Sequence, residues 1–373
     1  MTRLQTNTTD QVVVEDVNLQ IAGLLSDLAA VQTSPPKAWG YKQASAAVRE
    51  LDEPVGALVE ADGSLRKIVR IGPASTRVML EVLEHGHSPL VEAAVADSPR
   101  RDEIWQRRQW RERFLSHAKV RAILAETSAD AIRASDYRGD LQMHSTWSDG
   151  AQRLDQIVET GRALAYDYAA VTDHSAGLPI AKGVAQDRFV EQWAEIDAFN
   201  RGARGRFRLL KGVEANIRPD GSVDVDAEDR RHFDLVIAAP HSDLRSPRPQ
   251  TERLLTAVTS ERIHVLAHPR GRLYGSRPGL TADWEAVFGA AAEAGVAIEI
   301  DGDPFRQDLD YALAASALRA GCLLALDSDA HATDQWRYAD TAIAHARLAG
   351  APADRVINTW PIERLLAWAE NRH

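Results

Sequence analysis

The chain has 373 residues, which suits one large domain with a smaller partner, and 45% of them are hydrophobic, as in an ordinary globular protein. Its net charge of -10 argues against a protein that coats nucleic acid broadly, although a local basic groove remains compatible with it. The single cysteine, Cys322, lies in an apolar run and excludes an internal disulfide. A polar N-terminus without a signal-peptide core and the lack of a run of roughly 20 apolar residues favour a cytoplasmic protein with no membrane contact.

The first 96 residues are predicted to form a small helical domain, because apolar residues recur there at helical spacing. The predicted helices cover residues 17–31, 41–51, 55–59 and 75–85. Pro35 and Pro36 are expected to end the first of them, and Gly86 the last.

The stretch Ile68-Val69-Arg70-Ile71-Gly72 lies between the last two predicted helices. Such an Ile-x-x-Ile-Gly turn between two helices is typical of a helix-hairpin-helix, in which backbone N–H groups bind nucleic-acid phosphate at a helix N-terminus. Here Arg70 stands where the motif usually has its first glycine, and Pro73 removes one N–H donor. A helical bundle that serves only packing is therefore an open alternative.

Residues 97–135 are expected to form a connecting helical segment rich in basic and aromatic side chains. Its basic residues are Arg100, Arg101, Arg107, Arg108, Arg111, Arg113, Lys119 and Arg121, interleaved with Trp105, Trp110 and Phe114. Together with the helical domain, residues 97–121 would offer a surface to the phosphate backbone of DNA. The more ordinary interpretation is a solvated connecting helix whose tryptophans dock on a neighbour.

From residue 136 to residue 373, predicted strands and amphipathic helices alternate. An opening strand holds Gln142 and His144, and further strands are expected at residues 168–172, 208–213, 234–239, 263–267, 296–300 and 322–326. The helices between most of them are expected at residues 153–164, 187–199, 251–258, 282–294 and 309–320. Seven βα units within about 235 residues favour an α/β fold with a closed or distorted parallel (β/α)7 barrel over an open sheet.

Side chains of metal-ligand type follow the ends of these strands, where the chemistry of a βα barrel lies. Gln142 and His144 are two residues apart and so share one face of a strand, and Asp149 precedes a glycine in a turn that can return it to them. The later strands end in His174, Glu214, His241, His268, Asp329 and His331. Only the sixth strand, which ends at Asp301, lacks a histidine. One such histidine is usually a core residue, but packing does not explain nine ligand-type side chains at one end of a barrel.

Nine ligands of mixed histidine and carboxylate type are too many for one ion, because zinc takes about four and manganese about six. They fit two or three divalent ions that share bridging carboxylates, for which Glu214 and Asp149 are the natural candidates. Ligands without thiolate suit Mn²⁺, Zn²⁺ or Fe²⁺ alike. Such a cluster serves in-line displacement at phosphorus by a metal-activated water.

Four further residues near the predicted ligands are candidates for catalysis or substrate binding. Arg270 and Arg272 follow His268, and because arginine holds phosphate bidentately both are expected to bind substrate, with Arg270 as a clamp in the catalytic site. An ion pair between Arg270 and Asp301 or Asp303 is the alternative.

Asp173 and Lys182 complete this set. Asp173 is expected to support catalysis by orienting His174 or another ligand. Lys182 lies in the loop after the second strand, where it is expected to reach the phosphate of a substrate.

These motifs closely resemble those of the polymerase and histidinol phosphatase (PHP) superfamily over about residues 137–350. The matching phrases are Gln142-Met143-His144, Thr172-Asp173-His174, Gly212-Val213-Glu214, the isolated His241, Ala267-His268-Pro269 and Asp327-Ser328-Asp329-Ala330-His331. Residues 141–150, 172–175 and 267–273 look most like the PHP domain of bacterial family X DNA polymerases. Residues 17–95 are similar to the N-terminal helical domain of the same polymerases.

The resemblance implies a distorted seven-stranded barrel whose metal cluster is held by the nine ligands named above. It also implies metal-dependent phosphoesterase activity. In the polymerase branch that activity is 3′–5′ exonuclease, 3′-phosphatase or abasic-site endonuclease, usually with Mn²⁺. In the free-standing branch it is phosphatase action on small esters such as histidinol phosphate.

The chain departs from the polymerase branch in three places. About 40 residues separate the helical domain from the barrel, which leaves no room for a polymerase palm, so we expect no polymerising activity. The helix at residues 75–84 contains Arg77 and no lysine, which makes Schiff-base chemistry at an abasic sugar doubtful. Gln142 replaces the first histidine of the His-x-His motif, and its neutral amide is a weaker ligand that would hold one metal loosely.

Three functions are compatible with these features. The leading hypothesis is a metal-dependent phosphoesterase that acts on nucleic-acid 3′ ends and takes part in DNA repair. The second is a phosphatase of small phosphomonoesters with a purely structural helical domain, which the acidic pI and the altered hairpin turn favour. The third is a non-catalytic DNA-binding accessory protein, against which the nine ligands argue.

Overall fold

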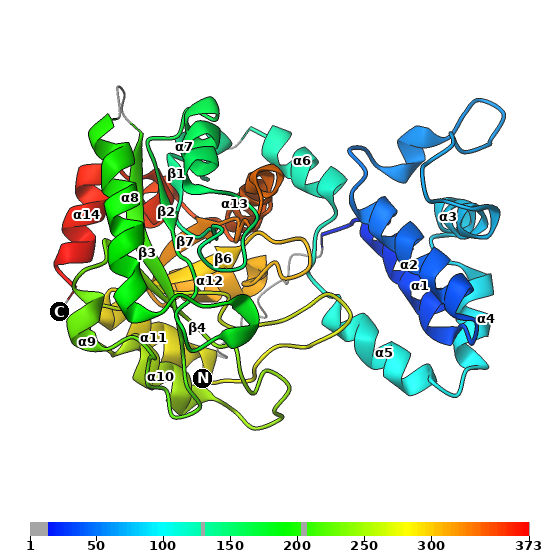
Figure 1. Cartoon of the computed structure of the whole chain (residues 1–373). Coiled ribbons are helices and arrows are strands. Elements are labelled where there is room, and N and C mark those ends of the chain that lie inside the picture. Colours follow the sequence, from blue (N-terminus) through cyan, green and yellow to red (C-terminus); the bar gives the residue numbers. More distant parts are fainter. Residues whose placement is uncertain (1–13, 128–130, 203–206, 373) are drawn as a thin grey trace, which may run out of the picture.

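The helical module stands beside a barrel of parallel strands in the computed structural model, which describes residues 14–127, 131–202 and 207–372 (Figure 1). Residues 1–13 of the predicted helical domain and residues 128–130 of the predicted connecting segment lie outside this description. The first helices are α1 (Val17–Val31), α2 (Pro35–Arg49), the 3-10 helix η1 (Val55–Leu58), α3 (Pro73–His85), α4 (Pro89–Ala96), α5 (Arg101–Trp110) and α6 (His117–Ala125).

Helices α1 to α5, here called the helical module (residues 17–110), share one apolar core. Ile21, Leu25, Val48, Met79, Val91 and Ile104 are buried in it, one or two from each helix. The prediction that two prolines end α1 is wrong, because α1 ends at Val31 and Pro35 begins α2. Proline lacks an N–H group and has a fixed φ, and both properties suit the first turn of a helix. Gly86 does end α3, with φ 73°.

The predicted helix-hairpin-helix turn is preceded only by the short η1 and an irregular segment. Arg70 has φ 69°, in the left-handed region where a glycine is usual. Gly72 begins α3 without a side-chain cap, so the N–H groups of its first turn are not capped by a side chain. A phosphate-binding role for this turn stays a prediction.

The predicted connecting segment contains two helices, α5 and α6, rather than one. Arg108 and Arg111 of its basic set bond the buried carboxylate of Asp27 on α1, at 2.7 and 2.5 Å. Part of the basic surface is therefore used to attach α5 and the residue after it to α1. Trp105 remains 52% exposed and does not dock on a neighbour as the ordinary interpretation expected.

Seven parallel strands pair in chain order to form the barrel. They are β1 (Gly139–Asp140), β2 (Tyr168–Val171), β3 (Arg208–Asn216), β4 (Leu235–Ala239), β5 (Val265–Leu266), β6 (Ala297–Asp301) and β7 (Leu323–Asp327). Beyond β1 and β7, a parallel bridge joins Met143 to Ala330, where the His144 N–H donates to the Ala330 carbonyl over 2.9 Å. The sheet is thus nearly closed, as the predicted (β/α)7 barrel requires.

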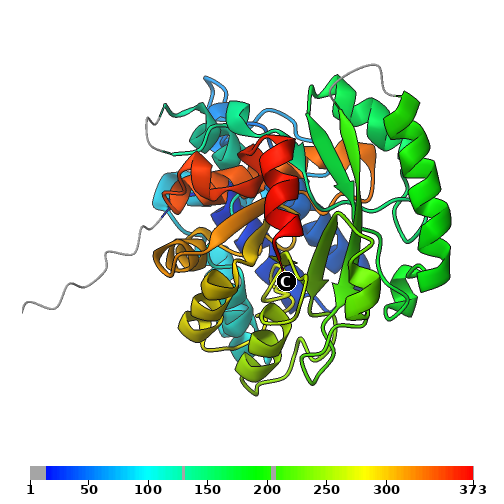
Figure 2. The same cartoon turned by 90° about the vertical axis from the view of Figure 1, so that its left-hand side faces the viewer.

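Helices cover the outside of the barrel. They are α7 (Leu154–Ala163), α8 (Phe189–Gly202), α9 (Ala227–Arg230), α10 (Thr251–Val258), α11 (Trp284–Ala294), α12 (Tyr311–Arg319), α13 (Ala339–Leu348) and α14 (Ile362–Glu370). In Figure 2, α14 lies across the end of the barrel at which the strands begin. There Trp360 and Leu365 join the apolar interior around Tyr168 and Ile237. This end is therefore filled with apolar side chains, and the polar chemistry is left to the carboxyl ends of the strands.

Among the described helices, none combines the length and the apolar character that crossing a membrane requires.

Candidate metal centre

The ligand-type side chains predicted from the sequence meet at the carboxyl ends of the strands. Within each of three overlapping groups, one ligand atom per residue lies within 4.8 Å of the others. The groups are His144, Asp149, His174 and His331; His174, Glu214 and His241; and His144, Glu214 and Asp329. His144, His174 and Glu214 each belong to two groups, so the three groups form one continuous centre.

Glu214, at 0% exposure, is the middle of this centre. Its Oε2 lies 3.2 Å from His144 Nε2 and 3.4 Å from His174 Nδ1. Its Oε1 lies 3.0 Å from His241 Nε2 and 2.9 Å from His268 Nε2. A carboxylate that faces two histidines through each oxygen has the geometry of a bridge between metal ions.

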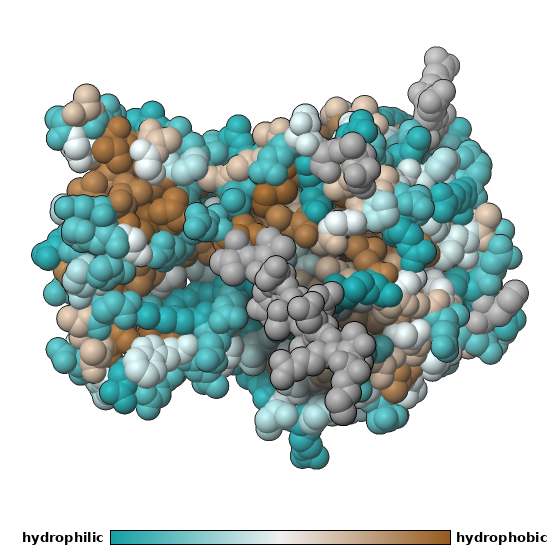
Figure 3. All heavy atoms as spheres, turned by 180° about the vertical axis from the view of Figure 1, so that it is seen from behind, coloured by the Kyte–Doolittle hydropathy of each residue, from teal (hydrophilic) through white to brown (hydrophobic). Residues whose placement is uncertain are grey.

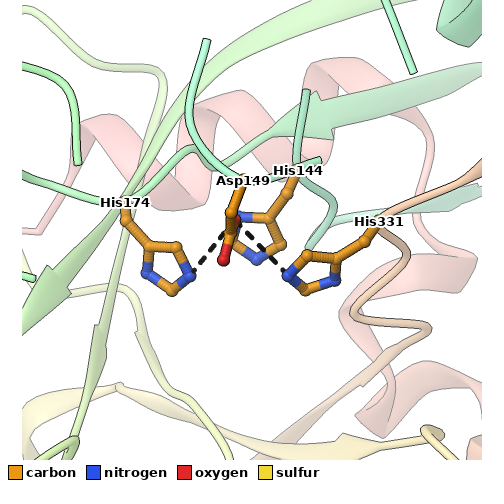
Figure 4. Close-up of side chains that lie close together, drawn as sticks. All are labelled: His144, Asp149, His174 and His331. Atoms are coloured by element: carbon orange, nitrogen blue, oxygen red, sulfur yellow. Dashed lines mark ion pairs between the residues drawn. The ribbon is translucent and has the colours of Figure 1, made fainter. Parts of the chain in front are cut away.

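Asp149 reaches the centre from the turn after β1 and faces three histidine rings (Figure 4). Its Oδ1 lies 3.5 Å from His331 Nε2, 3.8 Å from His174 Nε2 and 4.0 Å from His144 Nδ1. The His144 and His174 rings stack with their centroids 4.4 Å apart. Asp149 belongs to one ligand group and Glu214 to two, so the geometry favours Glu214 as the bridge.

Unsatisfied polar atoms show that the centre suits cations. Among the described residues, the following buried atoms make no hydrogen bond: Gln142 Oε1, His144 Nδ1, His174 Nδ1, His241 Nε2 and His268 Nδ1. A buried polar atom without a partner costs about 1–3 kcal/mol, so such atoms are rarely gathered at one place without a purpose. Divalent ions would give them partners.

Two histidines and two carboxylates of the centre have the charge states that metal binding requires, whereas the carboxylates Asp329 and Glu214 raise the pKa of His144, and Asp149 raises that of His331. Burial lowers the pKa of His174 to about 4 and also lowers that of His268, so both imidazoles are neutral and free to bind a metal. Burial acts to raise the pKa of Glu214, but His174 and His241 hold it well below its usual range. In the same way, Arg306 outweighs burial and keeps the pKa of Asp329 low.

Two ligands have left-handed backbone conformations. His268 has φ 26° and Asp329 has φ 50°, each just after the end of its strand. Non-glycine residues in this region are strained, and such strain gathers at functional sites where the surroundings enforce it. The backbone is therefore held in unfavourable conformations at the points where it presents ligands.

Comparison with known proteins agrees with this centre, although no protein-family model matches the chain. Over 232 residues the chain is 37% identical to the DNA polymerase/3′-5′ exonuclease PolX of Bacillus subtilis, a match that covers 62% of this chain and 40% of that protein. Over 250 residues it is 28% identical to the probable phosphatase YcdX of Escherichia fergusonii, covering 63% of this chain and 95% of that protein. These matches bear out the resemblance of the barrel to the PHP superfamily, and the chain spans less than half the length of PolX.

A solved histidinol phosphate phosphatase from Lactococcus lactis, complexed with zinc, L-histidinol and phosphate, is 17% identical over 58% of this chain and 94% of its own. The TM-score is 0.43.

Asp173 of the PHP motif holds a ligand loop. It accepts hydrogen bonds from the Ser145 N–H at 2.8 Å, the Ser145 hydroxyl at 2.6 Å, the Ser148 hydroxyl at 2.5 Å and the Gln192 amide at 2.6 Å. The loop 145–148 joins His144 to Asp149, so Asp173 is placed to orient these two candidate ligands. Of the two options predicted for Asp173, orienting His174 or another ligand, these contacts favour the second, and because it is fully buried its role in catalysis would be indirect.

Asn216 at the end of β3 was not predicted. Its side-chain oxygen lies 2.6 Å from His241 Nδ1 and so directs the other ring nitrogen toward Glu214. The position two residues after Glu214 on the same strand face is the signal that would have found it.

The two arginines predicted to bind substrate lie beside Asp310. Arg270 bonds this carboxylate at 3.0 Å, and not Asp301 or Asp303 as the alternative expected. Arg272 is 3% exposed and donates to the carbonyls of Arg306 and Gln307, so its predicted contact with substrate is wrong. A clamp role for Arg270 stays a prediction.

Lys182 is exposed, with φ 54° in the loop after β2. No contact with the ligand groups is found for it among the described residues, so its reach to phosphate also stays a prediction.

Arg306, unlike Arg270 and Arg272, forms an ion pair with a residue of the candidate metal centre. Its Nη2 lies 3.5 Å from Asp329 Oδ2 and its Nε lies 3.7 Å from Asp301 Oδ2, with 27% of the side chain exposed. It follows β6, the one strand that ends without a histidine, so the loop after that strand was the place to search. No pattern at the strand end marks it, because four residues separate it from Asp301.

Proposed function

We propose that the chain is a metal-dependent hydrolase of phosphate esters that acts on nucleic-acid 3′ ends, as a 3′–5′ exonuclease or 3′-phosphatase, and has no polymerase activity. The observation that carries this proposal is the continuous centre around Glu214 with the guanidinium of Arg306 beside it. Histidine and carboxylate ligands together with an accessible arginine suit a substrate that brings negative charge to the centre.

The residues of the three groups, with Gln142 and His268, would hold two or three divalent ions, of which Mn²⁺, Zn²⁺ and Fe²⁺ all suit the ligands. Such ions supply an activated water and offset the charge of the leaving oxygen. Arg306 would bind a phosphoryl oxygen, and Asp329 keeps its guanidinium turned toward the centre. Asp149 and His331, each about 30% exposed, mark the side from which substrate enters.

The choice of a 3′ end rests on two features. A relative named as a 3′-5′ exonuclease shares 37% identity over the matched region. The helical module adds Arg66, Lys67 and Arg70 near the uncapped start of α3, a place suited to phosphate. Since the chain between α4 and the barrel contains only the helices α5 and α6 and the 3-10 helix η2 (Ala134–Asp136) in its described part, it offers no second nucleotide-binding domain for polymerisation.

A phosphatase of small phosphomonoesters is the second candidate. It is favoured by the match to the probable phosphatase YcdX, which covers 95% of that protein and so needs only the barrel. In this case the helical module would have a structural role only. A DNA-binding protein with a purely structural metal centre is the third candidate.

One experiment separates these functions. Metal-stripped protein, with Mn²⁺, Zn²⁺ or neither restored, is incubated with a DNA oligomer that ends in a 3′-phosphate and with a panel of small esters that includes histidinol phosphate. Release of phosphate or nucleotides from DNA, absent in His268→Ala, supports the proposal. Turnover of small esters alone supports the second candidate, and no turnover by protein with bound metal supports the third.

A further inference from the structure

A cleft of about 480 Å³ separates the helical module from the barrel loop at residues 274–276. Hydrophilic residues border the hollow between the module, on the left of Figure 3, and the barrel. The charged residues that line the cleft are Lys42, Arg100, Arg107, Arg111 and Asp27. Asp27 pairs with Arg111, and Glu103 pairs with Arg100 and Arg107, so four cations against two carboxylates leave the cleft positive, with Lys42 as its unpaired cation in the described ranges.

Several donors in the cleft are not used by the protein. The Tyr274 hydroxyl and the Arg107 Nε are buried and make no hydrogen bond within the described residues. Lys42 is exposed, and no ion pair or hydrogen bond is found for it in the described ranges. Because buried tyrosine hydroxyls usually have a partner, a hydroxyl without one in a cleft that Arg111 and Lys42 also line is suited to an oxygen-rich ligand.

The arginines are held in place before any ligand arrives. Arg111 donates to the Gly23 carbonyl at 3.0 Å and bonds Asp27, while Arg107 lies 2.8 Å from a carboxylate oxygen of Glu103. Fixing these long side chains in advance removes much of the entropy that a ligand would otherwise have to overcome. The cleft is therefore preorganised for an anion.

The wall of the cleft is bonded to the metal centre's own loop. The Tyr274 N–H donates to the Phe305 carbonyl over 2.8 Å, and the next residue is Arg306. The ring of Tyr274 also lies under the guanidinium of Arg49, 4.4 Å from its centroid. The loop that lines the cleft and the loop that carries Arg306 are thus joined directly.

We propose that this cleft is a second phosphate-binding subsite, which holds the backbone of a nucleic-acid strand whose 3′ end lies at the metal centre. The inference rests on the proposed function. It deepens that function by identifying the cleft as the site at which a nucleic-acid strand, but not a small phosphate ester, is bound. A small phosphomonoester occupies the metal centre alone, whereas a strand carries phosphates enough for both sites. The ligand recognised here is a phosphodiester, because the cleft offers cations and hydroxyl groups rather than an apolar surface.

The test uses two charge reversals on the same helix in the full-length, metal-loaded protein. Lys42→Glu changes the cleft, and Lys37→Glu makes the same change at an exposed position of α2 that does not line it. Binding of a fluorescent single-stranded oligonucleotide is followed by anisotropy over a range of salt concentrations. We expect Lys42→Glu to weaken binding about tenfold and to reduce the salt slope by about one, with less than about a twofold effect of Lys37→Glu.

Further measurements separate failure of the subsite from failure of the proposed function. Tyr274→Phe removes only the unpartnered hydroxyl and is expected to weaken oligonucleotide binding while turnover of p-nitrophenyl phosphate stays unchanged. Equal effects of the two lysine variants would overturn the subsite whether or not the protein hydrolyses DNA. The subsite would also be overturned if millimolar inorganic phosphate removed the difference in oligonucleotide binding between Lys42→Glu and Lys37→Glu. That result would assign the cleft to a single free anion.

Discussion

Leu115 and Gln307 exchange two hydrogen bonds across the boundary between the connecting segment and the barrel. The Leu115 N–H donates to Gln307 Oε1 over 2.7 Å, and Gln307 Nε2 donates to the Leu115 carbonyl over 2.9 Å. Arg49 of the module covers the Phe305 ring, 4.5 Å from its centroid, and donates to the Pro304 carbonyl. The loop that carries Arg306 is therefore held from outside the barrel, and the helical part of the chain shares in the geometry of the metal centre.

Replacement of Arg306 tests its role at phosphate. Arg306 lies 3.5 Å from the candidate ligand Asp329. We therefore expect Arg306→Ala to lower kcat/KM for a phosphate ester about 100-fold, as loss of a charged transition-state contact does. Arg306→Lys keeps the charge without the bidentate geometry and should recover part of the activity. Metal content is measured alongside. Loss of metal in parallel with activity would show that Arg306 supports the ligands instead.

Arg49→Met tests whether the module positions the Arg306 loop. The change removes the contacts with Pro304 and Phe305 but keeps a side chain of similar length. We expect KM for a phosphate ester to rise about tenfold with unchanged metal content, because small displacements of a substrate-binding group are costly. Arg337→Met is the matched control, since it breaks another contact between module and barrel, with Glu50, that does not touch the loop. Equal effects of the two variants would contradict the idea.

Glu214→Gln tests the bridge at the middle of the centre. Loss of the negative charge leaves four histidines around a neutral amide, so we expect at least one metal ion fewer per chain and a loss of turnover of at least about 100-fold. Bound metal is counted by elemental analysis. The control is Glu191→Gln, an exposed carboxylate on α8, which should retain full metal content. Undiminished metal in Glu214→Gln would show that Glu214 does not bridge ions.

Adding metal to stripped protein should also raise its stability. A ligand that binds only the folded state stabilises it by about 2.7 kcal/mol at 100 times its Kd. We expect the thermal midpoint to rise with Mn²⁺ or Zn²⁺ in the wild type and less in Glu214→Gln. An unchanged midpoint in the wild type would argue that the centre does not bind these ions.

The strand positions and ligands of the barrel were predictable because both depend on local patterns. Short apolar runs marked β2 to β7 closely, and the ligand-type residues followed each strand end. β1 is only two residues long, and the predicted opening strand continues as a bridge at Met143. Its pairing depends on Ala330, far along the chain, which no local pattern contains.

The errors arose where distant residues decide the outcome. Arg272 was assigned to substrate because it follows His268, but the carbonyls of Arg306 and Gln307, more than 30 residues away, surround its guanidinium. Arg306 was missed for the same reason, since its partner Asp329 follows the next strand, β7. Pro35 was expected to end α1 but begins the next helix, α2, because proline alone does not say on which side of it a helix lies.

A buried histidine far from the metal centre makes the stability of the fold depend on pH. His264 accepts a hydrogen bond from the Val236 N–H at 2.8 Å and lies 3.1 Å from the Ala369 carbonyl of α14. Burial, with a smaller contribution from the charges of Arg262 and Arg372, lowers its pKa from 6.5 to about 3. Below pH 6.5 His264 therefore binds a proton in the unfolded chain, whereas in the folded chain it stays neutral until the pH approaches 3.

Stability from His264 is thus present above pH 6.5 and is lost as the pH falls toward 3, by about 1.4 kcal/mol per pH unit. We expect His264→Gln to be less stable than the wild type at pH 7, but its free energy of unfolding should fall less between pH 7 and pH 5, by about 2 kcal/mol. Urea unfolding of metal-free protein at the two pH values measures this difference. His345, whose burial also lowers its pKa to about 3, is present in both proteins and cancels in the comparison. If the two proteins lose the same stability on acidification, His264 is already protonated or exposed in the fold, and α14 is not held on the barrel by a neutral imidazole.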